Sequence, residues 1–327
     1  MILVTGGAGF IGSNLVAELS DSGLDVAVCD WFRKGDKWRN LASAALAKAV
    51  DPSQLVRFLE ERGDEIDYVF HMGAISSTTE RDVDLIVATN VRLSQKLWGW
   101  CASRGIPLVY ASSAATYGDG SRGFGDDGRD ESLGELRPLN AYGWSKHVFD
   151  RWVARRVERG DPAPPQWAGL KFFNVYGPNE YHKGSMQSIV AKSYGAASAG
   201  EPVTLFRSHH PDYEDGGQLR DFIYVRDCVR VMLWLRDHPE ASGLFNVGTG
   251  RAQSFRELIE ALFAAIGREP GFNWVDTPAE IRDRYQYYTR ADMTRLRAAG
   301  YEEPFADASE GVRDYVTRYL ATDNPYR

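Results

Sequence analysis

A tyrosine and a lysine four positions apart, Tyr142 and Lys146, carry the clearest chemical potential in this chain. At the start of a helix, positions i and i+4 lie on one face, so the phenol and the ammonium would be neighbours. A neighbouring positive charge favours the phenolate, and we expect it to lower the pKa of Tyr142 from about 10 towards neutrality. Such a tyrosine can remove a proton from a substrate hydroxyl at physiological pH. Taken alone, the pattern also fits a pair of residues on a helix surface.

Several hydroxyl side chains precede this pair, at the end of a predicted strand in the segment 110–118. We expect the hydroxyl of Ser113 to hydrogen-bond the substrate oxygen on which Tyr142 acts. The order of this serine, the tyrosine and the lysine along the chain makes a chance pattern improbable.

A glycine-rich turn follows the first predicted strand, in the segment Thr5–Gly12 with the sequence TGGAGFIG. Gly6 would allow the tight turn, Gly9 the close approach of a pyrophosphate, and Gly12 the packing of the next helix on the sheet. The helix N-terminus would then face the phosphates. Asp30 closes the following strand, where a carboxylate binds the adenosine ribose of a dinucleotide.

The residues after Asp30 bear on which dinucleotide binds. A carboxylate at this position favours NAD because it repels a 2′-phosphate. Arg33, Lys34 and Lys37 follow closely, however, and these cations would bind a 2′-phosphate and offset that repulsion. We therefore expect NADP, with NAD and a solvated basic loop as the alternatives.

Short apolar runs alternate with helical patterns through the first half of the chain. The predicted strands are Ile2–Thr5, Asp25–Asp30, Tyr68–His71, Leu108–Ala111, Leu170–Phe173 and, later, Leu244–Val247. The predicted helices are Asn14–Ser20, Ser53–Glu61, Val91–Ser103, Ser145–Arg159 and Phe255–Ile266, the last with Ser254 as its N-cap. This alternation predicts an α/β fold with a doubly wound parallel sheet, which binds ligands at the carboxyl ends of its strands.

The composition excludes several classes of function. The 327 residues carry a net charge of −7, which argues against nucleic acid and anionic membranes as partners. We see no run of about 18 apolar residues and no signal peptide, and expect a cytoplasmic protein. The three cysteines should be reduced core thiols. No Cys/His spacing suggests a metal, and the segment 209–218, which begins with two histidines, reads as a polar loop.

With the glycine turn, Ser113, Tyr142 and Lys146 in this order, the chain resembles the extended short-chain dehydrogenase/reductase family over essentially its whole length. The resemblance implies a Rossmann domain over residues 1–172, to which 221–250 returns, and a smaller α/β substrate domain over 173–327. It also implies a nicotinamide cofactor, with Lys146 orienting its ribose. Dehydratases of the family carry acids where this chain has Ala114 and Ala115, which disfavours elimination of water.

Within that family the closer resemblance is to the ADP-heptose 6-epimerases of lipopolysaccharide precursor synthesis. It rests on His71–Glu80, Ala111–Gly118, Phe173–Pro178, His182–Met186, Arg284–Gln286 and Leu296–Tyr301. The alternatives are another nucleotide-sugar epimerase or reductase, such as a UDP-hexose 4-epimerase, and a relative that has lost catalysis.

The resemblance to the 6-epimerases implies two bases, Tyr142 and Lys183, on opposite sides of the sugar. Inverting an alcohol at an unactivated carbon requires a temporary ketone. A ketone at C6 can rotate about the C5–C6 bond, so a proton donor at each oxygen position serves both directions. Alternatively, Lys183 is a pyrophosphate ligand or an ordinary loop lysine.

The same resemblance assigns further residues. For the cofactor it points to Gly6, Gly9, Phe10, Ile11, Gly12, Asp30, Trp31, Lys37, Met72, Gly73, Ala74, Ile75, Ser76, Asn90, Lys146 and Val175. For the substrate it points to Asn174, Ser185, Lys192, Phe206, Ser208, Arg220 and Tyr285. It also implies a homo-oligomer, a pentamer. The chain departs from the pattern at Trp31, Met72 and Lys192, and in a longer loop over 209–218.

Overall fold

The computed structural model describes residues 1–282 and 286–327. Its centre is a seven-stranded sheet in which every neighbouring pair is parallel. From one edge to the other, the strands are β11 (Gly243–Val247), β6 (Trp167–Phe172), β5 (Leu108–Ser113), β4 (Tyr68–His71), β1 (Ile2–Thr5), β2 (Val26–Cys29) and β3 (Lys48–Val50). The chain therefore starts in the middle of the sheet and winds outwards in both directions.

The strand order reverses between β1 and β4, and this position is the place where doubly wound sheets bind ligands. The connections that leave β1 and β4 diverge to opposite sides and open a crevice at the carboxyl ends. The expected fold, a doubly wound parallel sheet of the Rossmann type, is confirmed by this topology.

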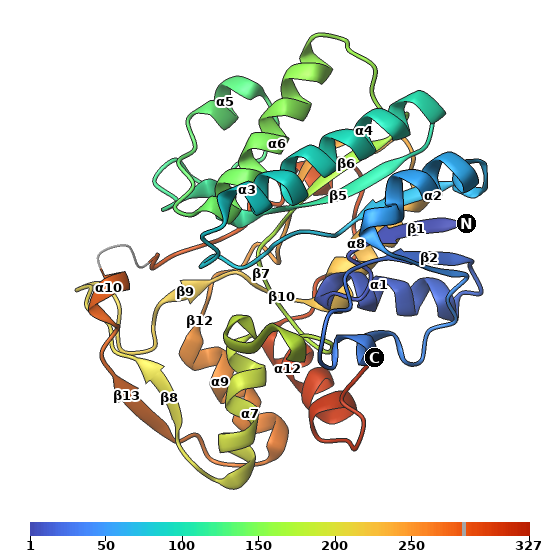
Figure 1. The fold of residues 1–327 in the computed structure, drawn as a ribbon. Coiled ribbons are helices and arrows are strands. Elements are labelled where there is room, and N and C mark those ends of the chain that lie inside the picture. Colours follow the sequence, from blue (N-terminus) through green and yellow to red (C-terminus); the bar gives the residue numbers. More distant parts are fainter. Residues whose placement is uncertain (283–285) are drawn as a thin grey trace.

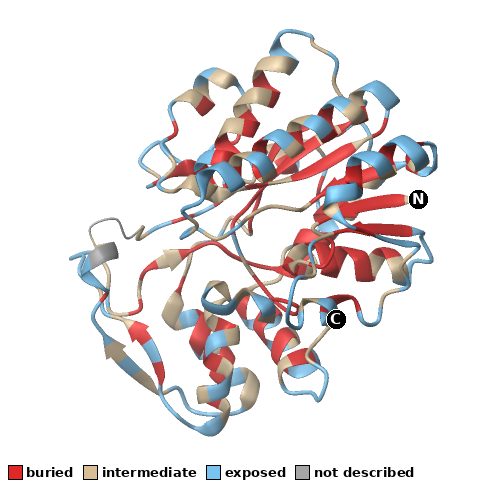
Figure 2. Cartoon of the chain, viewed as in Figure 1, coloured by how far each residue is buried: buried red, intermediate tan, exposed pale blue. Residues whose placement is uncertain are grey.

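Helices cover both faces of the sheet (Figure 1). One face packs against α1 (Phe10–Asp21) and α8 (Val225–Asp237). The other packs against α2 (Leu55–Arg62), α4 (Leu93–Arg104) and α6 (Ala141–Glu158), with the short α3 (Val83–Ile86) and α5 (Asp130–Gly134) beside them. Apart from the edge strand β3, the strands between these layers are buried along almost their whole length (Figure 2), because parallel strands covered on both faces contribute apolar side chains to each.

A smaller unit follows the sheet and has its own apolar core. Its helices are α7 (Ile189–Ala199), α9 (Phe255–Ile266), α10 (Ala279–Arg282) and α12 (Ala308–Tyr315). The short α11 (Thr294–Ala298) packs instead on β11 of the central sheet. Its strands form three pairs, β7 (Asn174–Tyr176) with β10 (Phe222–Tyr224), β9 (Leu219–Arg220) with β12 (Gln253–Ser254), and β8 (Val203–Phe206) with β13 (Phe272–Val275). Helices α7, α9 and α12 pack together at the end of the molecule opposite α4 and α6 (Figure 1).

The predicted elements are largely confirmed. Strands Ile2–Thr5 and Tyr68–His71 and helix Phe255–Ile266 have the expected bounds, and Ser254 caps that helix in a reciprocal pair with Glu257. The strand expected at Leu170–Phe173 begins earlier, at Trp167, because residues 167–169 pair with β5 and β11. All three cysteines are buried and free. Across residues 1–282 and 286–327, no helix is long and apolar enough to cross a membrane.

Asp221 ties the small unit to the central sheet. This side chain lies between β9 and β10 and is fully buried. One carboxylate oxygen accepts hydrogen bonds from the amide and hydroxyl of Thr249, at 2.7 and 2.8 Å. The other accepts from the amides of Gly250 and Ala291, both at 2.9 Å. Three chain segments therefore meet at one charged group, whose burial is offset by four donors.

We predict that Asp221→Ala destabilises the protein by about 3 kcal/mol, because it takes the acceptor from the buried amide of Ala291 and from the half-buried amides of Thr249 and Gly250. Urea unfolding followed by circular dichroism measures this loss. The matched control is Asp237→Ala, which removes an exposed carboxylate paired with Arg236 and should change stability by less than about 0.5 kcal/mol. Equal losses in the two variants would contradict the importance assigned to Asp221.

Candidate active site

A cavity of about 1360 Å³ lies at the carboxyl ends of the central strands and extends to the small unit. Most of the residues expected to form the site line it. They are Gly6, Gly9, Phe10, Ile11, Gly12, Asp30, Trp31, Lys37, Met72, Gly73, Ala74, Ile75, Ser76, Ser113, Tyr142, Lys146, Asn174, Val175, Lys183, Lys192 and Phe206. Residues far apart in the sequence are thus gathered around one space.

The glycine turn approaches the end of β4 closely. Gly6 has φ +66°, and a Cβ on it would lie 2.5 Å from the backbone of Gly73. A Cβ on Gly12 would lie 2.2 Å from the carbonyl oxygen of Gly6. Helix α1 begins directly after this turn, with Gly9 as its N-cap and no side chain covering its amides. The turn therefore presents backbone donors and a positive helix end to the cavity.

Asp30 and Lys37 form one ion pair at the edge of this turn. Lys37 Nζ donates to Asp30 Oδ1 at 2.6 Å and to the carbonyl oxygen of Trp31 at 3.1 Å. The other carboxylate oxygen accepts from the amide of Ala8 at 2.9 Å. The positive charge of Lys37 thus lies directly against the acid that would repel a 2′-phosphate. The Trp31 side chain is 47% exposed, and its stacking on an adenine stays a prediction.

Asn90 lies behind the cavity wall. Its carboxamide accepts from the amide of Ile75 at 2.8 Å and donates to that residue's carbonyl oxygen at 3.0 Å. It also donates to the hydroxyl of Ser145, which donates to the carbonyl oxygen of Tyr142. Asn90 therefore fixes the turn after β4 and the start of α6, and this use of its side chain differs from the direct cofactor contact that the sequence suggests.

Helix α6 brings Tyr142 beside Ser113. Asn140 is the N-cap of this helix, and its side chain accepts from the amide of Gly143 at 2.8 Å. A Cβ on Gly143 would lie 2.6 Å from the carbonyl oxygen of Ala115, so only glycine lets the helix dock so closely on the end of β5. Ser113 and Tyr142 then lie within hydrogen-bond reach of each other.

The expected lowering of the Tyr142 pKa by Lys146 is wrong for the protein alone. Burial raises the pKa of Tyr142, the hydrogen bond with Ser113 lowers it, and the negative charge of Asp150 raises it again. Lys146 Nζ instead donates to the carbonyl oxygen of Ala111 at 2.7 Å. Burial lowers the pKa of Lys146 to about 8, with Asp150 opposing that change.

Asp150 is a fully buried residue behind the cavity lining, and its role could not be recognised from the sequence. It follows Lys146 by four positions on the same face of α6, and this spacing was the available signal. Its carboxylate pairs with Lys171 Nζ at 3.1 Å, both side chains being 0% exposed, and accepts from Ser112 at 2.6 Å. Lys171 also donates to Thr116 at 2.8 Å. A buried ionic network thus joins α6, β5 and β6 beneath Tyr142.

Lys183 reaches the cavity from a different part of the chain. It belongs to the 3-10 turn Tyr181–Met186, after β7, and its ammonium lies 4.8 Å from the centre of the Phe10 ring. Burial lowers the pKa of Lys183, Glu180 raises it, and Lys192 lowers it. A lysine so placed exchanges a proton nearer to neutral pH than an exposed one.

The expected substrate residues divide into two sets. Asn174, Lys192 and Phe206 line the cavity. Among the described residues, Ser185 and Arg220 lie outside its lining, and Tyr285 lies outside the described part of the chain. Arg220 is buried and donates to the carbonyl oxygens of Leu219 and Gln286, an arrangement that differs from the expected diphosphate ligand.

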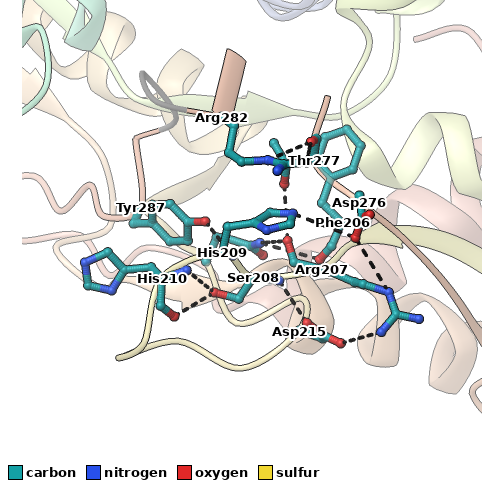
Figure 3. Close-up of polar contacts among 11 residues, drawn as sticks. Phe206, Arg207, Ser208, His209, His210, Asp215, Asp276, Thr277, Arg282 and Tyr287 are labelled. Atoms are coloured by element: carbon teal, nitrogen blue, oxygen red, sulfur yellow. Dashed lines mark hydrogen bonds and ion pairs between the residues drawn. The ribbon is translucent and has the colours of Figure 1, made fainter. Parts of the chain in front are cut away.

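Ser208 also lies outside the cavity lining, in the loop that follows β8 (Figure 3). Its hydroxyl donates to the carbonyl oxygen of His210 at 3.0 Å and accepts from that residue's amide at 3.1 Å. Its amide donates to Asp215. The loop is anchored to the chain beyond β13 by His209, whose amide donates to the Tyr287 hydroxyl at 3.0 Å. The Ser208 side chain therefore closes the loop.

The model of the NAD dependent epimerase/dehydratase family matches residues 2–248. The chain belongs to this family. A protein of Nitratidesulfovibrio vulgaris named ADP-L-glycero-D-manno-heptose-6-epimerase is 48% identical over the full length of both chains. One of Fusobacterium nucleatum with the same name is 42% identical, again over both full lengths.

Solved structures of this epimerase family have the same fold. The ADP-L-glycero-D-manno-heptose-6-epimerase of Helicobacter pylori is similar with a TM-score of 0.79 and 29% identity, covering 97% of this chain and 95% of that one. The UDP-glucose 4-epimerase of Thermus thermophilus in complex with NAD is similar with a TM-score of 0.70 and 29% identity, covering 95% and 96%.

The residues of this epimerase family member fit a nicotinamide dinucleotide. The backbone space at Gly6 and Gly12, the uncapped start of α1 and the acid at the end of β2 form the set that a dinucleotide requires. Across the described residues, no group of three or more acidic, histidine or cysteine side chains gathers as a metal site.

We predict that Asp150→Asn destabilises the protein by about 3–5 kcal/mol, because it leaves the Lys171 ammonium buried beside a neutral amide. Adding Lys171→Met to Asp150→Asn should recover at least half of that loss. Urea unfolding of the two single variants and the double variant measures the coupling. Losses that simply add would show that the two groups do not form the pair on which the position of α6 depends.

Proposed function

We propose that the protein inverts C6 of the heptose in ADP-D-glycero-D-manno-heptose, giving ADP-L-glycero-D-manno-heptose through a transient 6-ketone. The observation that carries this proposal is the convergence of Tyr142 and Lys183 on one cavity from separate elements, α6 and the turn after β7. Two proton-exchanging groups are what inversion through a rotating ketone requires. The heptose is proposed from the full-length relatives of that name.

The division of the chain follows the same logic. We propose that residues 1–172, with 221–250, form the cofactor domain and that 173–327 form the substrate domain. Tyr142 then belongs to the first and Lys183 to the second, so the sugar is held between them. As a homo-oligomer, the protein would carry one such site in each subunit.

Each side chain has one step in this reaction. Tyr142 takes the proton of the C6 hydroxyl. The hydrogen bond between Tyr142 and Ser113 holds the phenolic oxygen in place for this step. The glycine turn and Asp30 would hold a nicotinamide cofactor, which when bound would supply the hydride chemistry at C6. After rotation about C5–C6, Lys183 protonates the oxygen. The reverse reaction uses the two groups in the opposite order.

Conversion in the absence of added cofactor tests the proposed reaction. We expect purified protein to convert ADP-D-glycero-β-D-manno-heptose to a mixture of the two C6 epimers, followed by proton NMR. UDP-glucose is the comparison substrate, for the alternative of a 4-epimerase, and should remain unchanged. No heptose conversion, even with NADP⁺ or NAD⁺ added, would reject the proposed substrate.

We predict that Tyr142→Phe and Lys183→Met each lower turnover by about 10²–10⁴-fold, because each removes a proton-transfer group. Cofactor content, measured by absorbance after denaturation, should remain that of the unmodified protein. Lys96→Met is the matched control, since Lys96 is an exposed residue of α4, and should leave turnover unchanged. Full activity in either site variant would remove that residue from the proposed pair.

We also propose NADP as the cofactor, supported by the pairing of Lys37 with Asp30 and by the neighbouring Arg33 and Lys34. Lys37→Ala leaves Asp30 without its cation and removes a phosphate ligand. We predict that this variant loses roughly tenfold in affinity for NADP⁺ relative to NAD⁺, measured by titration calorimetry. An unchanged ratio of the two affinities would contradict the assignment.

A further inference from the structure

The segment that carries Lys183 has little regular structure to hold it. It runs from the end of β7 to the start of α7 and contains Gly184 with φ +53°. Asn179, at its start, is buried with φ +71°, which is uncommon for a residue other than glycine. Its side chain accepts from the amide of Arg327 at 2.9 Å and donates to Ser13 at 2.9 Å. Backbone in such a conformation persists where the surroundings fix it.

Glu180 is the second fixed point of the segment, and it is fully buried. One carboxylate oxygen accepts from the amide of Gly177 at 3.3 Å and from the hydroxyl of Ser188 at 2.7 Å. The other accepts from the Ser188 amide. The Tyr315 hydroxyl of α12 donates to the first of these two oxygens, at 3.3 Å. Glu180 thus joins the two ends of the segment, residues 177 and 188, with Lys183 between them.

A buried carboxylate is costly, and these neutral donors do not remove its charge. Two charged groups act on Lys183, namely Glu180 from its own turn and Lys192 from α7. Helix α1 presents only the ring of Phe10 to the ammonium. The phenols of Tyr181 and Tyr315 lie beside Glu180, and burial raises the pKa of both, so they stay neutral. Glu180 is therefore the negative charge that favours protonated Lys183.

We propose that Glu180 is a positioning residue for Lys183, because its carboxylate joins residues 177 and 188 and so closes the turn that carries the lysine. This inference rests on the proposed function, in which Lys183 donates a proton to the rotated ketone oxygen. Glu180 itself does not line the cavity, so it acts on the reaction only through the lysine.

The proton on Lys183 can be measured without substrate. Competitive acetylation of the purified holoenzyme with acetic anhydride across pH, read by peptide mass spectrometry, gives the midpoint at which each lysine becomes reactive. Glu180 raises the pKa of Lys183, so removing its charge in Glu180→Gln lowers the midpoint, by about one unit. The midpoint of exposed Lys96 should not move. An unchanged Lys183 midpoint in Glu180→Gln would overturn the proposal.

A kinetic cycle separates this effect from a general loss of structure. Glu180→Gln should lower turnover roughly tenfold when Lys183 is present, but less than twofold in a Lys183→Met background. Equal losses in both backgrounds would overturn the proposal. Should Glu180→Gln fail to fold, Glu180→Asp serves instead. Because Glu180→Asp keeps the negative charge, the acetylation midpoint of Lys183 in this variant should stay within about 0.3 units while turnover falls. A downward shift of the midpoint by a full unit would overturn the proposal.

The two proposals fail in different ways. If the protein does not epimerise the heptose, the acetylation midpoints still report whether Glu180 controls the proton on Lys183. If it epimerises the heptose and the midpoint does not respond to Glu180→Gln, only the inference about Glu180 is lost.

Discussion

The docking of helix α6 on the carboxyl end of β5 is the contact on which the rest of the site depends. Two features hold it, the glycine at position 143 against the backbone of Ala115 and the buried ion pair of Asp150 with Lys171. The pair sits where both charges are removed from water, so each needs the other. Because Ser113 ends β5 and Tyr142 begins α6, this one contact sets the distance between the two hydroxyls.

Lys183, the second proton-transfer group that we propose, is held by separate contacts. Lys183 lies on a turn after β7 that is closed by Glu180 and supported by α12 and the C-terminal residue Arg327. The sugar would therefore lie between a group fixed by the central sheet and a group fixed by the small unit. Asp221, between β9 and β10, connects these two supports through four hydrogen bonds. The proposed reaction needs a proton donor on each side of a rotating carbonyl, and this arrangement places Tyr142 on one side and Lys183 on the other.

The sequence predicts the features that local rules determine. The glycine turn, the acid at the end of β2 and the tyrosine–lysine pair follow from spacing within one strand–turn–helix or one helix, and each lies at the cavity. It could not predict the pairing of Asp150 with Lys171, which depends on the neighbouring positions of α6 and β6. The wrong direction for the Tyr142 pKa has the same origin, since burial and the bond from Lys146 to Ala111 are tertiary effects. Arg220 and Ser208 lie outside the cavity lining, and their side chains donate to main-chain carbonyls, which a sequence motif does not show.

The central claim is that a single bound nicotinamide removes and returns the same hydrogen at C6. The most direct test uses ADP-D-glycero-manno-heptose carrying deuterium at C6, incubated with the protein in ordinary water, with the product analysed by mass spectrometry and NMR. Transfer to the cofactor and back predicts that the inverted product keeps its deuterium at C6, with no hydrogen gained from solvent. Loss of the deuterium to water would mean that inversion proceeds by removal of a C6 proton, which would contradict the hydride route through Tyr142 and Lys183.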